Sequence, residues 1–375
     1  MNNSFIEKII RSFIDSKLTP LIIIAAILLG MLAVVFLPRE EEPQIVVPMI
    51  DVFVQMPGAT AQEVEQRVTY PMEKFLWEIP GVEYIYSTSM PGMSMAIVRF
   101  YVGEDEEKSI AKFYNKLYAH LDLIPPGVSM PIIKPRYIDD VPIVLLTLWS
   151  DQYDCFTLRR IACQLEEELK QINDVSLTEV IGGQRRELRI VLDTSRLRAY
   201  RISLLQVTNI IRSANHELIV GTFSTGNQEF IVEAGGFINT ADELGNIVVG
   251  VHNGRPVYLR DIAQVSDGPK EPDSYLFLGV GPQAKVKGIN AEPGKIYRAV
   301  TISVAKRKGK NATKIAEAVL HKVEALKGTL IPKEVNITIT RNYGETAKEK
   351  SDELLKHLFL ATVSVTILIG FFLGT

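Results

Sequence analysis

Two uncharged apolar stretches frame this chain and constrain its fold more than any other feature. Residues 18–37 run between Lys17 and Arg39, and residues 358–375 follow His357. An apolar segment of this length can span the hydrocarbon core of a bilayer as an α-helix. We therefore expect transmembrane helix 1 at 18–37 and the start of transmembrane helix 2 at 358–375. Because the second stretch stops with the chain, we also expect an N-terminal fragment of a longer multi-pass membrane protein.

The charged residues around the first stretch predict its orientation. Lys8, Arg11 and Lys17 precede it, whereas Arg39 is followed by three glutamates. Short flanking segments rich in Lys and Arg stay in the cytoplasm. The N-terminus is therefore expected inside the cell and the segment 38–356 outside the membrane.

The segment before the first stretch, residues 1–17, alternates apolar and charged residues at helical spacing. This pattern predicts a cytoplasmic amphipathic helix on the inner leaflet, and it is equally compatible with the first turns of helix 1. A cleavable signal peptide is the competing interpretation of the first stretch. Its apolar run is longer than the roughly 7–15 residues of a signal-peptide core and no small-x-small cleavage pattern follows, so an uncleaved anchor is favoured.

The composition excludes nucleic acid as a partner and bounds the number of domains. The 375 residues, 47% of them hydrophobic, suffice for two membrane helices and two or three soluble domains. The net charge is −3, and no basic run with interleaved aromatic residues occurs. Cys155 and Cys163 fall on one expected helix, roughly 12 Å apart, which is too far for a disulfide. We expect two free, buried thiols.

The sequence carries no signature of an enzyme. The five histidines are scattered singly, and none has a second His, a Cys or a paired carboxylate at a metal-ligand spacing. Metalloprotease, nucleophile-elbow and phosphate-loop motifs do not occur. We therefore expect no enzymatic activity, no catalytic residue, no cofactor and no metal site.

Two features keep a metal open as an alternative. Met90, Met93 and Met95 offer soft thioethers of the kind that bind Cu(I), although methionines beside a turn more often fill packing gaps. Asp139 and Asp140 are potential cation ligands, although a solvated loop between strands is the simpler interpretation. Neither pattern specifies a metal by itself.

Between the apolar stretches, the periodicity predicts two repeating units and an insertion. Residues 43–139 follow the order strand, helix, strand, strand, helix, strand. This βαββαβ order is typical of the split βαβ, ferredoxin-like fold. Residues 140–185 and 271–341 repeat that order around an interruption at 186–270. The predicted fold class is thus an α+β membrane protein with two ferredoxin-like subdomains, the second interrupted by an inserted α+β subdomain.

Local signals place individual elements in these units. Thr60 forms a capping box at the first helix, and Ser203 and Thr240 are expected to cap helices of the insertion. The Asn-Gly pair at 253–254 predicts a hairpin turn. Residues 221–227 are expected to form an exposed turn.

Several segments together resemble the resistance-nodulation-division (RND) efflux permeases, of the acriflavin-resistance type. The resemblance is carried, in order, by PGAT (57–60), EVE (63–65), PME (71–73), RPVYLRDIAQV (255–265), YGETA (343–347) and FFLG (371–374). Each segment is a weak signal alone. Their order and spacing over nearly the whole chain make the resemblance specific.

The resemblance implies a domain organisation. In this family, 43–139 would be the first porter subdomain, 140–185 with 271–341 the second, and 186–270 an inserted docking subdomain. All of them would lie in a large periplasmic loop of a multi-pass protein of the bacterial inner membrane. The resemblance also implies a homotrimer whose pore is lined by the helix near 106–121, working with a periplasmic adaptor protein and an outer-membrane channel.

The resemblance further implies a binding pocket for an amphiphilic small molecule, partly on the second porter subdomain. Leu145, Glu179 and Ile181 fall at positions that line this pocket. Drug exporters of the family often have an aromatic residue where this chain has Ile181. The alternative interpretation of these positions is a plain buried strand.

Two departures from the family limit what the chain is expected to do alone. The turn at 221–227 is shorter than the arm with which drug-exporting members reach into a neighbouring subunit, so a tight trimer is in doubt. Neither apolar stretch contains an ionisable residue, although proton coupling requires one in the membrane. We therefore expect the N-terminal portion of a proton-driven efflux permease, inactive alone. The alternative is a membrane-anchored periplasmic binding or scaffold protein without transport activity.

Overall fold

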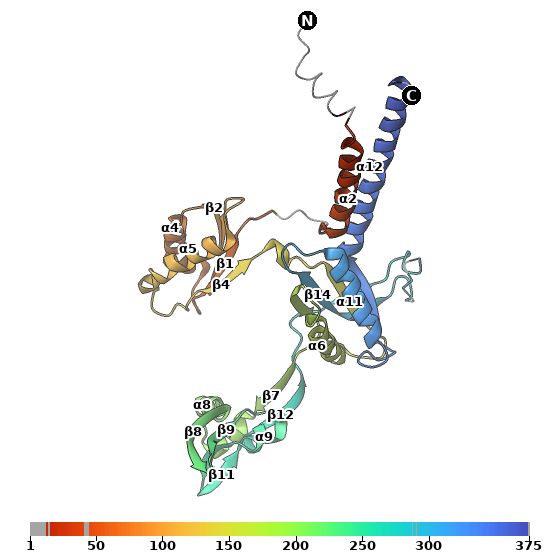
Figure 1. Ribbon diagram of the computed structural model, residues 1–375. Helices are drawn as coiled ribbons and strands as arrows, with labels where there is room; N and C mark the ends of the chain where they lie inside the picture. Colours follow the sequence, from red (N-terminus) through yellow and green to blue (C-terminus); the bar gives the residue numbers. More distant parts are fainter. Residues whose placement is uncertain (1–12, 14–15, 41–44, 287, 290, 374–375) are drawn as a thin grey trace.

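The computed structural model describes residues 13, 16–40, 45–286, 288–289 and 291–373. The chain is a mixed α+β protein in four parts, which Figure 1 shows as a pair of long helices, two units of sheet and helices, and an insertion. The two helices lie side by side at one end of the molecule, and the insertion lies at the opposite end.

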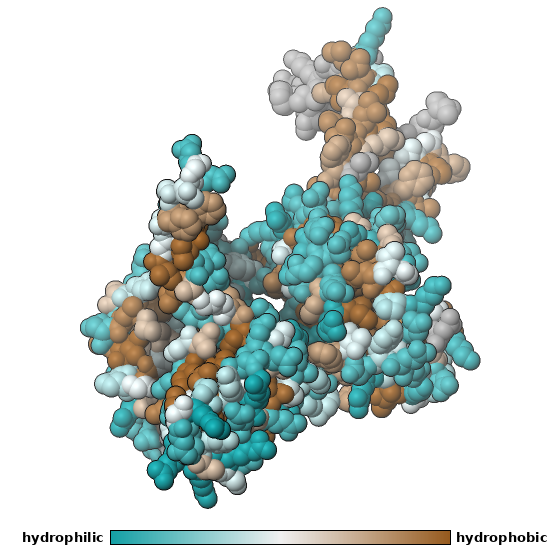
Figure 2. Space-filling view, turned by 90° about the horizontal axis from the view of Figure 1, so that it is seen from below, coloured by the Kyte–Doolittle hydropathy of each residue, from teal (hydrophilic) through white to brown (hydrophobic). Residues whose placement is uncertain are grey.

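Both apolar stretches form helices. Helix α2 covers Thr19–Phe36, and helix α12 covers Tyr343–Leu373, so it begins in polar sequence well before the second apolar stretch. Their apolar side chains are exposed and belong to the brown areas that interrupt the hydrophilic surface in Figure 2. Of the helices in the described ranges, Tyr343–Phe372 alone is long and apolar enough to cross a membrane, and Thr19–Val34 counts among shorter apolar helices. The amphipathic helix expected at 1–17 falls almost entirely outside the described residues.

The first unit is a four-stranded antiparallel sheet in the order β2-β3-β1-β4. Helices pack on one of its faces around fully buried Ile50, Phe100 and Phe113. The predicted capping box is confirmed, because the side chains of Thr60 and Glu63 each accept a hydrogen bond from the other residue's backbone amide. The elements are β1 (Met49–Gln55), α3 (Ala61–Val64), a π-helical turn (Glu65–Thr69), α4 (Tyr70–Trp77), β2 (Val82–Met90), β3 (Met93–Phe100), α5 (Glu106–Tyr118), a 3₁₀ turn (Leu121–Leu123) and β4 (Ile132–Arg136).

The second unit is assembled from two distant parts of the chain. Its sheet has the order β13-β14-β5-β15, and β6 also pairs with β14. Helices α6 and α11 cover one face, with Leu146, Leu158 and Ile302 fully buried between. Cys155 and Cys163 both lie on α6 and are free, as predicted, but they are only partly buried. The elements are the 3₁₀ turn η3 (Ile138–Asp140), β5 (Val144–Trp149), α6 (Cys155–Lys170), β6 (Val175–Ile181), β13 (Phe277–Gly279), β14 (Ile296–Lys306), α11 (Ala312–Leu326) and β15 (Asn336–Asn342).

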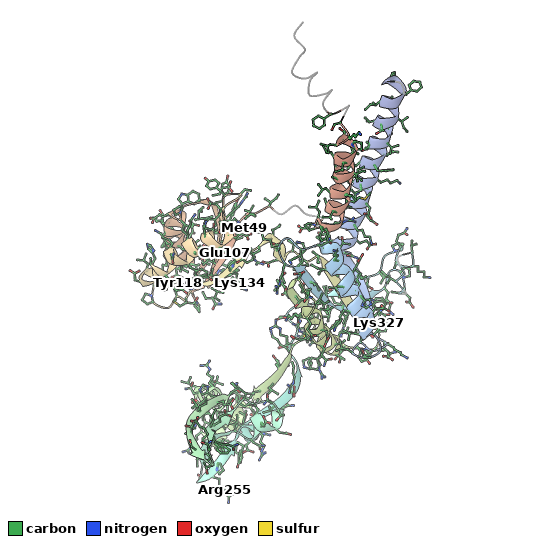
Figure 3. The ribbon with its side chains drawn as sticks, in the orientation of Figure 1. Met49, Glu107, Tyr118, Lys134, Arg255 and Lys327 are labelled. Carbon is green, nitrogen blue, oxygen red and sulfur yellow. The ribbon has the colours of Figure 1, made fainter. Side chains whose placement is uncertain are left out.

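The insertion leaves and rejoins the second unit through one antiparallel ribbon, formed by β7 and β12. It has its own small core around Val249, Leu259 and Ile262. Ser203 and Thr240 cap its helices as predicted. Arg255 marks its far tip in Figure 3. The elements are β7 (Arg186–Leu192), α7 (Thr194–Tyr200), α8 (Leu204–Ala214), β8 (His216–Thr225), β9 (Gln228–Gly236), α9 (Ala241–Gly245), β10 (Val248–His252), β11 (Arg255–Tyr258), α10 (Leu259–Ile262) and β12 (Ala263–Pro269).

The turn expected at 221–227 is exposed, as predicted, but its bounds are wrong, because the turn is limited to Gly226 and Asn227. Strands β8 and β9 pair along almost their whole length and form a hairpin arm whose side chains are nearly all exposed. Gly226 and Asn227 close it with positive φ values of 58° and 59°, the geometry of a type I′ turn. The arm buries neither face, so its strands lack the alternation of apolar and polar residues that marks a strand in a sequence. The available signal was the Gly-Asn pair.

The cap of α6 supports a test of local stability. The Asp154 carboxylate accepts a hydrogen bond from the backbone amide of Thr157, at 2.8 Å, and hydrogen bonds from Thr157 hold the pKa of Asp154 below its ordinary value. Asp154→Ala should cost about 1 kcal/mol of stability near neutral pH. Because the folded pKa is depressed, this contribution is present above the ordinary carboxyl pKa and fades as the pH falls through the folded value. Hydrogen exchange of α6 amides at neutral and acidic pH measures it, and a pH-independent difference between the two proteins would contradict it.

Candidate functional site

The sheet of the second unit has one face covered by helices α6 and α11. On its other face no helix of the described residues lies, although Val280, Ala284 and Ala291 pack against Trp149 and Ala299 at one end. Along β5, Val144, Leu146 and Leu148 point into the core beneath α6 and α11. Alternate residues of a strand point to opposite faces, so Leu145 and Thr147 belong to the other face. We call this second surface the open face.

The three residues predicted to line a pocket come together on the open face. Leu145 is paired with Ser303 of β14, which is itself paired with Glu179 of β6, so these residues form one row across the sheet. Ile181 lies in the next row, opposite Thr301. Leu145 is half-buried, Glu179 is exposed, and Ile181 is 42% exposed. The alternative of a plain buried strand therefore does not hold for Glu179 and Ile181.

A hydroxyl network accompanies these side chains on the open face. The Thr147 hydroxyl lies 2.8 Å from that of Thr301 and 3.1 Å from that of Thr340. The indole Nε1 of Trp149 donates to the Thr338 hydroxyl at 2.9 Å. Thr147, Thr301 and Thr338 are buried by their neighbours although no helix covers them. The sequence did not predict these residues as part of a site, because the network depends on the register of strands that are over 150 positions apart.

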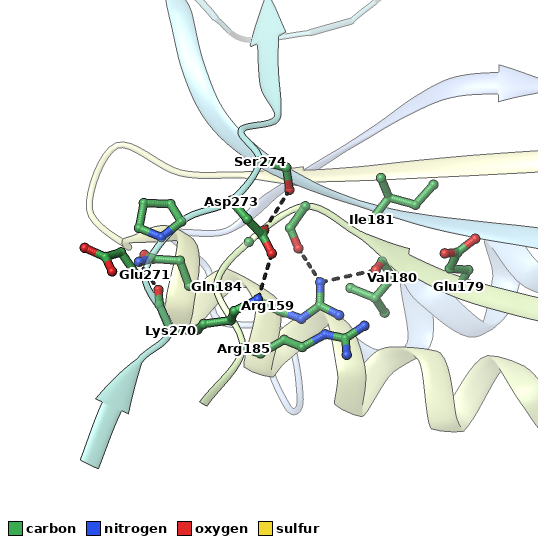
Figure 4. A pocket seen from close by; sticks show the side chains of 13 residues that line it. Arg159, Glu179, Val180, Ile181, Gln184, Arg185, Lys270, Glu271, Asp273 and Ser274 are labelled. Atoms are coloured by element: carbon green, nitrogen blue, oxygen red, sulfur yellow. Dashed lines mark hydrogen bonds and ion pairs between the residues drawn. The ribbon is translucent and has the colours of Figure 1, made fainter. Parts of the chain in front are cut away.

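A pocket of about 390 Å³ adjoins the open face at the end of β6. Figure 4 shows it between β6 and the two segments that connect the insertion. The Arg159 guanidinium donates to the backbone carbonyl of Val180 at 3.2 Å and also to that of Gly182, which fixes one wall. On the opposite side, the Lys270 ammonium lies 2.7 Å from the Asp273 carboxylate and lowers its pKa. Glu179 and Ile181 thus line the same pocket as the charged residues Arg159, Lys270 and Asp273.

A wider hollow of about 690 Å³ lies at the other edge of the same sheet. It is lined by β15 and by Trp149, whose ring lies 4.5 Å from that of Tyr297, centroid to centroid. The guanidinium of Arg341 stacks over Tyr343 at 4.7 Å. The open face therefore runs between two hollows, one lined by the Lys270–Asp273 pair and one lined by Trp149 and Arg341.

Lys306, at the end of β14, lies among carboxylates at the junction of the two units. Its ammonium is 3.1 Å from Glu40 and 3.7 Å from Asp139, and its side chain is 9% exposed. Burial raises the pKa of Asp139, against the opposing effect of Lys306. In the neighbouring pair, Lys308 lies 3.0 Å from Glu106, and their hydrogen bond raises the pKa of Lys308.

The structure places the potential metal ligands Met90, Met93, Met95 and Asp139 in two separate regions. No group of three His, Cys, Asp or Glu side chains suited to a metal occurs in the part of the chain that the structure describes. Asp139 lies on the 3₁₀ turn η3 and pairs with Lys306, and its side chain is only 14% exposed, so the interpretation of a solvated loop is wrong for this residue. Met90 and Met93 face each other across the β2–β3 hairpin, and Met95 follows on the same face of β3; all three are half-buried.

Comparison with known proteins places the chain in a family. Residues 9–375 match the family described as AcrB/AcrD/AcrF. The chain is 29% identical over 374 residues to the cation efflux system protein CusA of Escherichia coli K12, covering 98% of this chain and 34% of that protein. It is 27% identical over 357 residues to the multidrug resistance protein MdtC of Yersinia enterocolitica, covering 95% and 33%. The chain thus spans about one third of the length of these curated relatives, and it belongs to the AcrB/AcrD/AcrF family of resistance-nodulation-division permeases.

Proposed function

We propose that this chain forms a porter region of a proton-driven efflux permease that exports amphiphilic compounds. The observation that carries the proposal is the open face, where Leu145, Glu179 and Ile181 lie together beside buried hydroxyls and between two hollows. Such a surface offers an amphiphile apolar contact through Ile181 and a carboxylate, that of Glu179, for a cationic head group.

The proposal includes a division into subdomains. Residues 43–139 are the first porter subdomain, 140–185 with 271–341 the second, and 186–270 the docking subdomain. The strand order β2-β3-β1-β4 supports a ferredoxin-like first subdomain, and the pairing of β6, β14, β5 and β15 supports the same fold for the second. Residues 18–37 and 358–375 are transmembrane helices of a multi-pass inner-membrane protein with a large periplasmic loop.

The partners are a second and third copy of the chain, a periplasmic adaptor protein and an outer-membrane channel. The β8–β9 arm supports the trimer, because it carries exposed apolar residues such as Ile219, Phe223 and Ile231. Large exposed apolar surfaces of this kind mark interfaces between proteins. The arm projects further than the turn expected at 221–227, and we infer that it is the part of the insertion that reaches a neighbouring copy.

The cargo we favour is an amphiphile rather than a metal cation. The relatives' names divide between cation efflux and multidrug resistance. On the open face, the exposed carboxylate of Glu179 lies near the exposed apolar side chain of Ile181, which suits a large organic molecule better than a hard cation. Since neither 18–37 nor 358–375 carries an ionisable residue, we expect residues 1–375 alone to bind cargo without driving its efflux.

The test is binding of a cationic amphiphilic dye, rhodamine 6G, to the purified chain by fluorescence polarisation. Ile181→Asp replaces an apolar contact with a charge, and losing the burial of such a side chain costs about 1.5–3 kcal/mol. We therefore expect the affinity for the dye to fall about tenfold or more.

Val191→Asp is the matched control, because Val191 is an exposed β-branched residue on a strand of the insertion, away from the open face. The control should leave dye binding unchanged. Equal affinities of the parent chain and Ile181→Asp would contradict a cargo surface here and favour the alternative, an anchored binding or scaffold protein.

A further inference from the structure

Two connections of the chain meet at the end of strand β14. Glu40 belongs to the segment that leads from α2 towards the first unit, and Asp139 lies on the 3₁₀ turn η3, which links the first unit to the second. Both carboxylates approach the ammonium of Lys306, at 3.1 Å and 3.7 Å. One lysine of the second unit therefore contacts both of the segments that connect the first unit to the rest of the chain.

Lys306 is buried enough for its contacts to matter. Its side chain is 9% exposed, and those of Glu40 and Asp139 are 16% and 14% exposed. An ammonium removed from water is stable only when it is paired, and removing one partner of a buried pair costs much more than removing an exposed one. The lysine can leave this position only if both linking segments move with it or water enters.

Other contacts near the end of β14 also connect the second unit to the first unit and to the long helices. Lys308, two residues further along, pairs with Glu106 in the first turn of α5, at 3.0 Å. The backbone amide of Ala312 donates to the carbonyl of Arg39 at 3.1 Å, and Arg39 pairs with Asp352 of α12 at 2.8 Å. The end of β14 is thus tied to the first unit and to both long helices.

In the described residues, ion pairs are prominent among the contacts between the first unit and the rest of the chain. Figure 1 shows it set to one side of the second unit. Its own core is separate from the core of the second unit. An orientation held mainly by linkers and ion pairs depends on how firmly those ion pairs hold.

We propose that Lys306 is an electrostatic clasp, a positioning residue that sets the orientation of the first unit relative to the second. It does so by holding Glu40 and Asp139 together at the end of β14. A displacement of α2 or α12 reaches the clasp through Glu40 or Arg39, so the same contact transmits movement of the long helices to the first unit.

The test measures the distance between the two units in the full chain, by pulsed electron paramagnetic resonance. Spin labels are placed at Tyr118→Cys in the first unit and Lys327→Cys in the second, two exposed sites marked in Figure 3. The background carries Cys155→Ala and Cys163→Ala, because the native thiols would also be labelled. In the parent we expect one narrow distance population, and Lys306→Met should abolish it in favour of a broad one.

Three further variants separate the clasp from general damage. Lys306→Arg keeps the charge and should retain the narrow population. Lys310→Met removes an ion pair with Asp174 that lies within the second unit. This variant should also retain the narrow population. Asp139→Asn tests the clasp from the other side and should broaden the distribution. A narrow population in Lys306→Met, or equal broadening in Lys310→Met, would overturn the proposal; amide hydrogen exchange of both cores verifies that each variant is folded.

Discussion

Gly183→Ala should strongly destabilise the sheet of the second unit, although it adds only one methyl group. Gly183 has φ of +69°, a conformation that residues with a Cβ atom rarely adopt. An added Cβ would lie 2.7 Å from the Cβ of Arg159, 2.8 Å from the carbonyl oxygen of Cys155 and 2.9 Å from Val300. We expect a loss of about 3 kcal/mol, roughly 1 from the left-handed backbone and about 2 from overpacking. Hydrogen exchange of the β14 amides measures this loss.

The control for Gly183→Ala separates backbone strain from the clash. Gly127 has φ of +84° and no atom within 4 Å of an added Cβ. Gly127 lies in the first unit, so exchange of the β1 amides is the readout there, and Gly127→Ala should show only the backbone part, about 1 kcal/mol. If the two variants lost equal stability, the close packing of the β6 end against α6 would play no part in holding the sheet.

Gly344→Ala should separate helices α11 and α12. Gly344 lies in the first turn of α12, where an added Cβ would come within 2.5 Å of the Cβ of Ala316 and 2.8 Å of the carbonyl oxygen of Ala312. The Thr313 hydroxyl donates to the Gly344 carbonyl at 2.9 Å, so the two helices are also joined by a buried hydrogen bond. Overpacking and the strained bond should together cost about 3 kcal/mol. The expected readout is faster hydrogen exchange in α11 and at the start of α12.

Gly370→Ala provides the helical control for this variant. It lies on the same helix with nothing within 4 Å of an added Cβ. The stability there should stay the same or rise slightly, since alanine favours a helix over glycine by about 1 kcal/mol. Unchanged exchange in Gly344→Ala would mean that α12 does not depend on close contact with α11.

The elements of the soluble part could be predicted where local chemistry decides them. β6 lies at the predicted residues because a stretch rich in β-branched residues runs from the turn residues Asn173 and Asp174 to the glycines at 182–183. Ser203 and Thr240 cap their helices as short polar residues before apolar runs. The sequence also led to Leu145, Glu179 and Ile181, which the structure gathers on one face.

The remaining features depend on what distant segments do to each other. The rows of the open face require β14 to pair with β5 and β6, which lie more than one hundred positions away, and no local pattern specifies that register. The Lys306 contacts likewise bring together Glu40 and Asp139 from two linking segments that carry no periodic signal. The arm of β8 and β9 was missed because strands exposed on both faces lack the alternation that burial imposes.

The two ends of the insertion meet, and this determines when the second unit can finish folding during synthesis. The Lys270 amide donates to the Arg185 carbonyl at 2.7 Å, where the insertion leaves and returns. Strand β5 must wait for β14 and β15, which emerge from the ribosome only after the whole insertion. An insertion that folds on its own brings those distant strands close before they pair, and so lowers the loop entropy that the sheet must overcome. The nascent chain would therefore complete its interior modules before the unit that contains them.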